Sequence, residues 1–192
     1  MAEIKSALEL ALEKAERFGK ASKEELAKER YHEQGRQLAV NYLKGEGDLE
    51  EELKNLPPEA LEPVRQAVKE VLLRNITLPR DETVDERQRR ALEGLLVAAS
   101  NKKGMGLLKK EVEQIWQQFL QARNGAYQQL KASFSHQLTS YARALEAQLG
   151  ARVRLEVEHL PQFQEEWRKF ETQLINQFEP VLADRKERMA AL

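Results

Sequence analysis

The stretch Ser100–Lys110, with the sequence SNKKGMGLLKK, has the residue types of an anion-binding loop. Two glycines lie between two pairs of lysines, and a helical apolar pattern begins directly behind them. Backbone amides at the start of a helix attract anions, and glycine lets a phosphate approach the backbone closely. The residues that would bind a phosphate or a nucleic acid here are Lys102, Lys103, Gly104, Gly106, Lys109 and Lys110.

The known nucleotide-binding motifs need more than this stretch offers. A P-loop follows a buried strand and places a Ser or Thr after its second glycine and lysine, whereas no strand pattern precedes Gly104 and no Ser or Thr follows Gly106. A dinucleotide-binding loop needs a strand and a third glycine. Glycine and lysine are ordinary residues at helix ends. We therefore favour a flexible joint with solvated lysines over an anion site.

Two E-x-x-H runs raise the question of a carboxylate-bridged metal site in a helical bundle. They run from Glu29 to His32 and from Glu156 to His159. Di-iron bundles combine two such runs with a glutamate from each of two further helices. Glutamate is abundant here, and Glu29 is expected to face water. We therefore expect no metal site, and a helical carboxylate–metal protein is only the second alternative.

Composition excludes several other kinds of chemistry. The chain contains no cysteine, which removes disulfides, thiolate nucleophiles and cysteine metal sites. No nucleophile elbow surrounds its serines. Its 31 basic and 32 acidic residues give a formal net charge of −1, so the whole chain has no attraction to nucleic acid or acidic membranes. Glutamates interrupt the N-terminal apolar residues, and no run approaches the ~20 apolar residues of a membrane span. We expect a cytoplasmic, non-enzymatic protein without a cofactor or membrane contact.

The first hundred residues show helical periodicity in short segments. An amphipathic helix is expected up to Phe18, with Gly19 as its C-terminal cap. A capping residue followed three positions later by glutamate then marks three helix starts, at Ser22, Asp48 and Thr83. The helix that begins at Ser22 is expected to end in the KGEGD stretch, residues 44–48. This part of the chain therefore predicts a cluster of short helices.

From residue 107 a narrow apolar stripe continues at steps of three and four for roughly forty residues. This pattern is typical of a coiled-coil seam. Its first residues should lie beyond the reach of the final helix, so that either the N-terminal helices or another subunit must cover them. We favour ordinary core within the chain, because large exposed apolar patches are rare on monomers. As an interaction face, the candidate residues are Leu108, Val112, Ile115, Trp116 and Phe119.

A second apolar stripe follows Pro161, so the two long helices are expected to form an antiparallel hairpin. A turn near residue 155 would bring Trp167 and Phe170 to Tyr141, and Phe178 to Leu130 and Phe134. Residues 151–158 are ambiguous, because their apolar residues alternate with charges as in a strand but also fit a helical face. We favour helix and leave a short β segment as the alternative.

The predicted fold is all-α, with an N-terminal helical subdomain over residues 1–100, a joint at 101–106 and a long helical hairpin at 107–192. The leading hypothesis for function is a structural or adaptor protein that acts through helix–helix contacts with a partner or a second copy. The alternative from another class is anion or nucleic-acid binding through residues 100–110. Nothing in the sequence identifies a partner or a small-ligand pocket.

Overall fold

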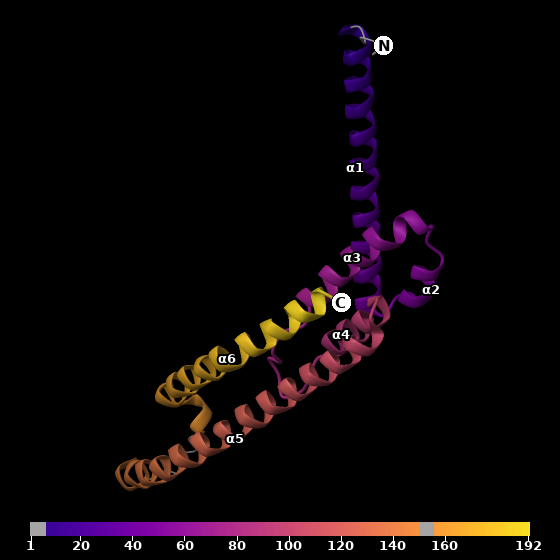
Figure 1. Ribbon diagram of the computed structural model, residues 1–192. Coiled ribbons are helices and arrows are strands. Elements are labelled where there is room, and N and C mark those ends of the chain that lie inside the picture. Colours follow the sequence, from indigo (N-terminus) through magenta and orange to yellow (C-terminus); the bar gives the residue numbers. More distant parts are fainter. Residues whose placement is uncertain (1–6, 150–155) are drawn as a thin grey trace. The chain divides into compact units, whose positions relative to one another are not determined.

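In a computed structural model, the backbone is described for residues 7–149 and 156–192, and the side chains for residues 25–136, 138, 139 and 156–192. The elements are α1 (Ala7–Lys44), α2 (Leu49–Lys54), α3 (Pro58–Arg74), α4 (Glu86–Ala98), α5 (Lys102–Leu149), a 3-10 turn η1 (Val157–His159) and α6 (Pro161–Ala190). Figure 1 shows these helices, and the described residues contain no strand. The all-α prediction is therefore confirmed. The proposed β segment falls on residues 151–155, outside the described residues, and on η1.

The chain divides into two compact units. Unit 1 consists of Met1–Asn75 and Arg90–Ser100, and unit 2 of Ile76–Arg89 and Asn101–Leu192. Residues 76–89, which the sequence placed with the N-terminal helices, thus belong to the unit that contains α5 and α6. Residues 102–106, expected to form a joint, lie in the first turns of α5.

In unit 1, α1 is one long helix, so the predicted break at Gly19 and Ser22 is wrong. A single glycine costs a helix only about 1 kcal/mol relative to alanine, and the residues around it are mostly strong helix formers. The true end of α1 follows the sequence signal at KGEGD. Gly45 adopts the left-handed conformation there, with φ at 85°. The Glu46 amide donates to the Asn41 carbonyl at 2.9 Å. This is the bonding of a Schellman C-cap.

Helix α3 packs closely along α1. A Cβ atom at Gly35 would lie 2.5 Å from the carbonyl oxygen of Val64 and 2.8 Å from Cβ of Ala67, so only glycine allows this approach. The hydroxyl of Tyr31 donates to Glu59 at 3.3 Å. Between these helices, Asp48 caps α2 by accepting from the amides of residues 50 and 51, which confirms the predicted helix start.

In unit 2, α6 runs back along α5. Edge-to-face contacts pair Phe119 with Phe178 at 5.5 Å and Tyr127 with Trp167 at 5.0 Å between ring centroids. Rising numbers in α5 meet falling numbers in α6, so the two helices are antiparallel (Figure 1). Figure 1 also shows that α5 extends beyond the level at which α6 begins.

The register of this pairing differs from the prediction. Trp167 meets Tyr127 rather than Tyr141, and Phe178 meets Phe119 rather than Leu130 or Phe134. Phe134 instead contacts Phe163, in the first turn of α6, while α5 itself continues to Leu149. The periodicity of two stripes fixes which faces meet but not the register, which also depends on how far α5 continues past the start of α6. The predicted turn near residue 155 lies outside the described residues.

The 3-10 turn η1 is tied to both long helices. Glu158 forms an ion pair with Lys131 of α5, and its carbonyl accepts from Gln164 Nε2 of α6 at 3.1 Å. The side chain of Val157 is buried. The hydrogen-bonded ion pair holds the pKa of the Glu158 carboxyl below its usual value and the pKa of Lys131 above its usual value.

Candidate functional site

The segment 76–85, here called the stapled loop, has its first anchor on the neighbouring helices at one backbone carbonyl. The carbonyl oxygen of Thr77 accepts from Trp116 Nε1 of α5 at 2.8 Å and from Gln88 Nε2 of α4 at 2.9 Å. The same Gln88 nitrogen donates to the Thr77 hydroxyl at 2.8 Å. Both donor side chains are buried, at 2% and 8% exposure. The carbonyl therefore has a defined position between two rigid elements.

The first turn of α4 supplies the second anchor of the stapled loop. The Asp85 carboxylate accepts from the amide of Arg87 at 3.0 Å, and the Asp85 amide donates to the Gln88 side chain at 3.1 Å. This reciprocal pair is a capping box. The predicted box of Thr83 and Glu86 is therefore wrong by two residues, because Asp85 and Gln88 satisfy the same rule and Gln88 also serves Thr77.

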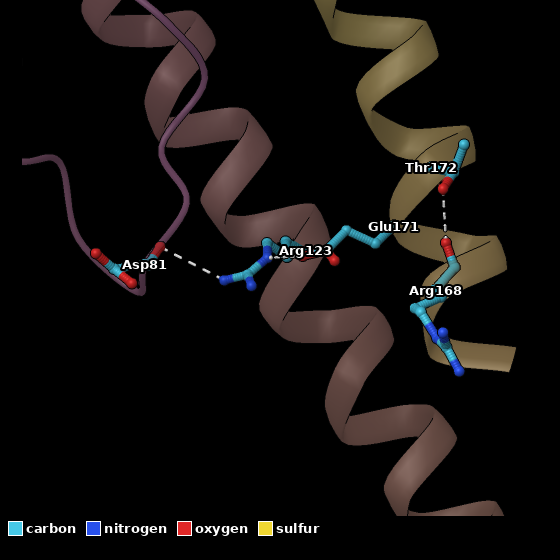
Figure 2. Close-up of polar contacts among 5 residues, drawn as sticks. All are labelled: Asp81, Arg123, Arg168, Glu171 and Thr172. Carbon is cyan, nitrogen blue, oxygen red and sulfur yellow. Dashed lines mark hydrogen bonds and ion pairs between the residues drawn. The ribbon is translucent and has the colours of Figure 1, made fainter. Parts of the chain in front are cut away.

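Arg123 joins the stapled loop to both long helices. Its Nε donates to Glu171 of α6 at 2.8 Å, and its Nη1 donates to the Asp81 carbonyl at 3.4 Å. Figure 2 shows the guanidinium reaching from α5 toward Asp81 on one side and Glu171 on the other. The guanidinium carbon also lies 5.7 Å from the Trp167 ring centroid. One side chain thus ties together the loop, α5 and α6.

These contacts form one side of an open groove of about 980 Å³ in unit 2. This volume is at the upper end of the range of ordinary ligand sites. We call the exposed part of the stapled loop the wall of the groove and the lining residues of α5 its floor, and α6 contributes Trp167. The lining residues are Arg80, Asp81, Glu82, Thr83, Leu120, Gln121, Arg123, Asn124, Tyr127, Gln128 and Trp167.

The floor of the groove carries a row of amides beside an aromatic corner. Gln121, Asn124 and Gln128 are exposed and follow one another at steps of three and four, which places them along one side of the helix. Tyr127 and Trp167 are half-buried and meet edge to face. Amides both donate and accept hydrogen bonds, whereas the rings offer apolar contact. The groove therefore suits a ligand that has both kinds of surface.

The five seam residues proposed as an interaction face are buried in the chain. Their exposed fractions run from 0% to 7%, for Leu108, Val112, Ile115, Trp116 and Phe119. The expectation that the final helix does not reach this part of α5 is wrong. Arg185 of α6 pairs with Glu111, and a Cβ atom at Gly104 would lie 3.2 Å from Leu192. The register explains this error, because each residue of α6 meets an earlier residue of α5 than predicted.

The basic glycine stretch is the capped beginning of a helix. The side chain of Asn101 accepts from the Gly104 amide at 2.9 Å, as an N-cap residue does. Lys102, Lys103 and Lys110 are exposed, and Gly106 is half-buried. Lys109 pairs with Glu113 at 3.3 Å. The structure thus places this stretch on the first turns of α5 rather than in a loop.

The two E-x-x-H runs lie in different units. Glu29 and His32 are on α1, while His159 and Glu156 approach each other to 3.6 Å at η1 and are both largely exposed. Within the described residues, no group of three His, Asp or Glu side chains could hold a metal ion.

Sequence reasoning missed the groove, although part of its signal was visible. The amides at 121, 124 and 128 are a polar row at helical spacing, but glutamine is common on the solvated face of any long helix. The wall comes from a segment whose sequence neighbours belong to unit 1. Only the fold brings Asp81 next to Arg123.

Most of the chain matches one protein family. Residues 50–191 match the model of a family described as "Family of unknown function (DUF6657)", and the chain belongs to this family. The stapled loop and the entire groove lie within the matched residues. Neither the curated proteins nor the solved structures contain a significant match. Among the described helices, none combines the length and apolar character needed to cross a membrane.

Proposed function

We propose that the protein is a non-enzymatic adaptor that binds a partner protein through the groove of unit 2. The observation that carries the proposal is the combination of an open groove with walls that are already fixed inside the chain. Thr77 and Asp81 hold the loop wall through Trp116, Gln88 and Arg123.

Preorganisation is the physical reason that such a groove favours binding. A partner that docks on a mobile loop must bear the entropy of ordering it, about 0.5–1.5 kcal/mol for each immobilised side chain. In this groove, the bonds to the Thr77 carbonyl and to Asp81 have already ordered the wall. The amides and rings on the floor, represented by Asn124 and Tyr127, remain available for contact.

The binding mode differs from the one that the sequence suggested. A partner helix on the α5 seam would need side chains such as Val112 and Phe119 at the surface, whereas these form the core. The groove lies further along α5 and offers a mainly polar floor with one aromatic corner. The adaptor proposal therefore rests on a grooved surface beside the helix pair and not on the seam between the two helices.

Affinity capture with matched variants of the full chain tests the proposal. Asn124→Arg places a long charged side chain on the groove floor, while Gln129→Arg makes the same change at an exposed position of α5 outside the groove. We expect a discrete partner to be captured by the wild-type protein and by Gln129→Arg but lost with Asn124→Arg. Capture of the same proteins by all three forms, or of none, would overturn the proposal.

A further inference from the structure

We propose that the groove takes a short extended peptide segment, bearing one bulky apolar residue with a basic residue close to it. This inference rests on the proposed adaptor function and specifies the partner's chemistry. Three features of the groove carry it: the amide row, the aromatic corner and the charge of the loop wall.

The amide row fits the main chain of an extended peptide. Asn124 and Gln128 lie four residues apart on α5, which is about 6 Å along the helix axis. Alternate residues of an extended chain repeat every ~6.6 Å, so both amides can meet equivalent peptide groups. Each side-chain amide accepts one peptide N–H and donates to a peptide carbonyl. A helical partner cannot use the row in this way, because its backbone groups are bonded internally.

The aromatic corner provides a site for a single apolar side chain. Leu120, Tyr127 and Trp167 line the same groove and are all half-buried. The two rings are held edge to face, and Tyr127 also contacts Phe163 with ring centroids 5.6 Å apart. Rigid rings offer contact area with little loss of side-chain entropy. One bulky residue of the peptide would cover this corner.

The loop wall gives the groove its charge preference. Arg123 is neutralised by its ion pair with Glu171. The exposed charges that remain on the wall are the carboxylates of Asp81 and Glu82 and the guanidinium of Arg80. Two negative charges against one positive charge favour a basic residue in the bound segment.

The length of the floor limits the size of the segment. From Leu120 to Gln128 the helix rises by about 12 Å. An extended chain covers that distance with about four residues. A segment of this length makes few side-chain contacts, so the backbone bonds to the amide row carry much of its recognition.

The test uses the full-length protein and a phage-displayed library of random heptapeptides as the probe. Selection on the wild-type protein is combined with counter-selection on Asn124→Arg. Enriched peptides are then synthesised, and their affinity for each variant is measured by fluorescence anisotropy. We expect sequences that share one bulky apolar residue and a nearby Lys or Arg.

Backbone N-methylation then distinguishes main-chain recognition from ordinary side-chain contact. Methylating the amides one at a time should weaken binding about tenfold at alternate positions, the effect of losing roughly one hydrogen bond. Gln128→Ala should also weaken binding, whereas Gln129→Arg should leave it unchanged. Peptides that become helical when bound, or whose affinity does not respond to N-methylation, would refute the inference.

The two proposals fail in different ways. If a partner is captured in a manner sensitive to Asn124→Arg but no peptide is enriched, the extended-peptide inference is wrong and the adaptor function stands. If neither experiment distinguishes Asn124→Arg from Gln129→Arg, the groove is not a binding site and both proposals fall.

Discussion

The Thr77 carbonyl should show strong coupling between its two donors. Trp116→Phe removes one donor and keeps an aromatic ring, and Gln88→Met removes the other and keeps a side chain of similar length. In either single variant the carbonyl still has one buried donor, at 2.8 or 2.9 Å. In the double variant it has none, although it points toward side chains that are almost fully buried.

The expected losses of unfolding free energy follow from this difference between the single variants and the double variant. Loss of one hydrogen bond costs about 1 kcal/mol of unfolding free energy, and the smaller ring in Trp116→Phe adds about another 1 kcal/mol of packing. Gln88→Met should cost about 1–2 kcal/mol, because it also removes the acceptor of the Asp85 amide, which water can replace at that exposed residue. In the double variant the Thr77 carbonyl faces two buried side chains without a donor, which costs a further ~1–3 kcal/mol. The double variant should therefore exceed the sum of the single variants by about 1 kcal/mol or more.

Urea unfolding followed by tryptophan fluorescence measures these unfolding free energies for unit 2. The chain has two tryptophans, Trp116 and Trp167, and both lie in unit 2. Trp167 still reports in the variants that lack Trp116. Independent sites add to within about 0.3–0.5 kcal/mol. A double variant that matches the sum within this margin would refute the view that Trp116 and Gln88 hold the loop together through the Thr77 carbonyl.

Three further predictions concern other parts of the molecule. Gly125→Ala should raise the free energy of unfolding by about 0.5–1 kcal/mol, because a Cβ there meets nothing within 4 Å and alanine favours helix; an unchanged or lower melting temperature would contradict this. Gly35→Ala should have the opposite sign and cost about 1–3 kcal/mol, because its Cβ would meet the Val64 carbonyl at 2.5 Å; a rise in the melting temperature would show that α1 and α3 are not so close. Glu158→Gln should lower the urea midpoint at neutral pH. Lys131 lowers the pKa of Glu158 in the folded state, so the ion pair stabilises the fold above the unfolded pKa of about 4.3 and is lost as the pH falls through the lower folded value. Below that pH the urea midpoints of the wild type and the variant should converge. A difference between the midpoints that persists in acid would point to a cause other than charge.

Two helix ends were predicted correctly, because at each one the sequence offered a single local capping feature. Asp48 caps α2, and the glycine-rich turn after Lys44 ends α1, because each of these residues satisfies backbone groups next to it. Where two nearby residues could serve the same purpose, the choice depended on tertiary contacts. Asp85 rather than Thr83 caps α4, since Gln88 also reaches Thr77.

Features that depend on distant parts of the chain were not available from the sequence. Helical periodicity indicated which side of α5 is apolar, and Phe119 is indeed buried. The same pattern holds for any register of α6, so it did not predict the contact between Phe119 and Phe178. The groove depends on that register and on the return of segment 76–89 to unit 2. Its amides therefore looked like solvated polar residues.

Site-specific photo-crosslinking in living cells tests binding at the groove most directly. A photoreactive phenylalanine analogue replaces Asn124 on the groove floor in one form of the protein and Gln129 outside the groove in another. Our account predicts a discrete protein adduct from position 124 that is missing from position 129. No adduct at position 124, or the same adducts at both positions, would contradict it.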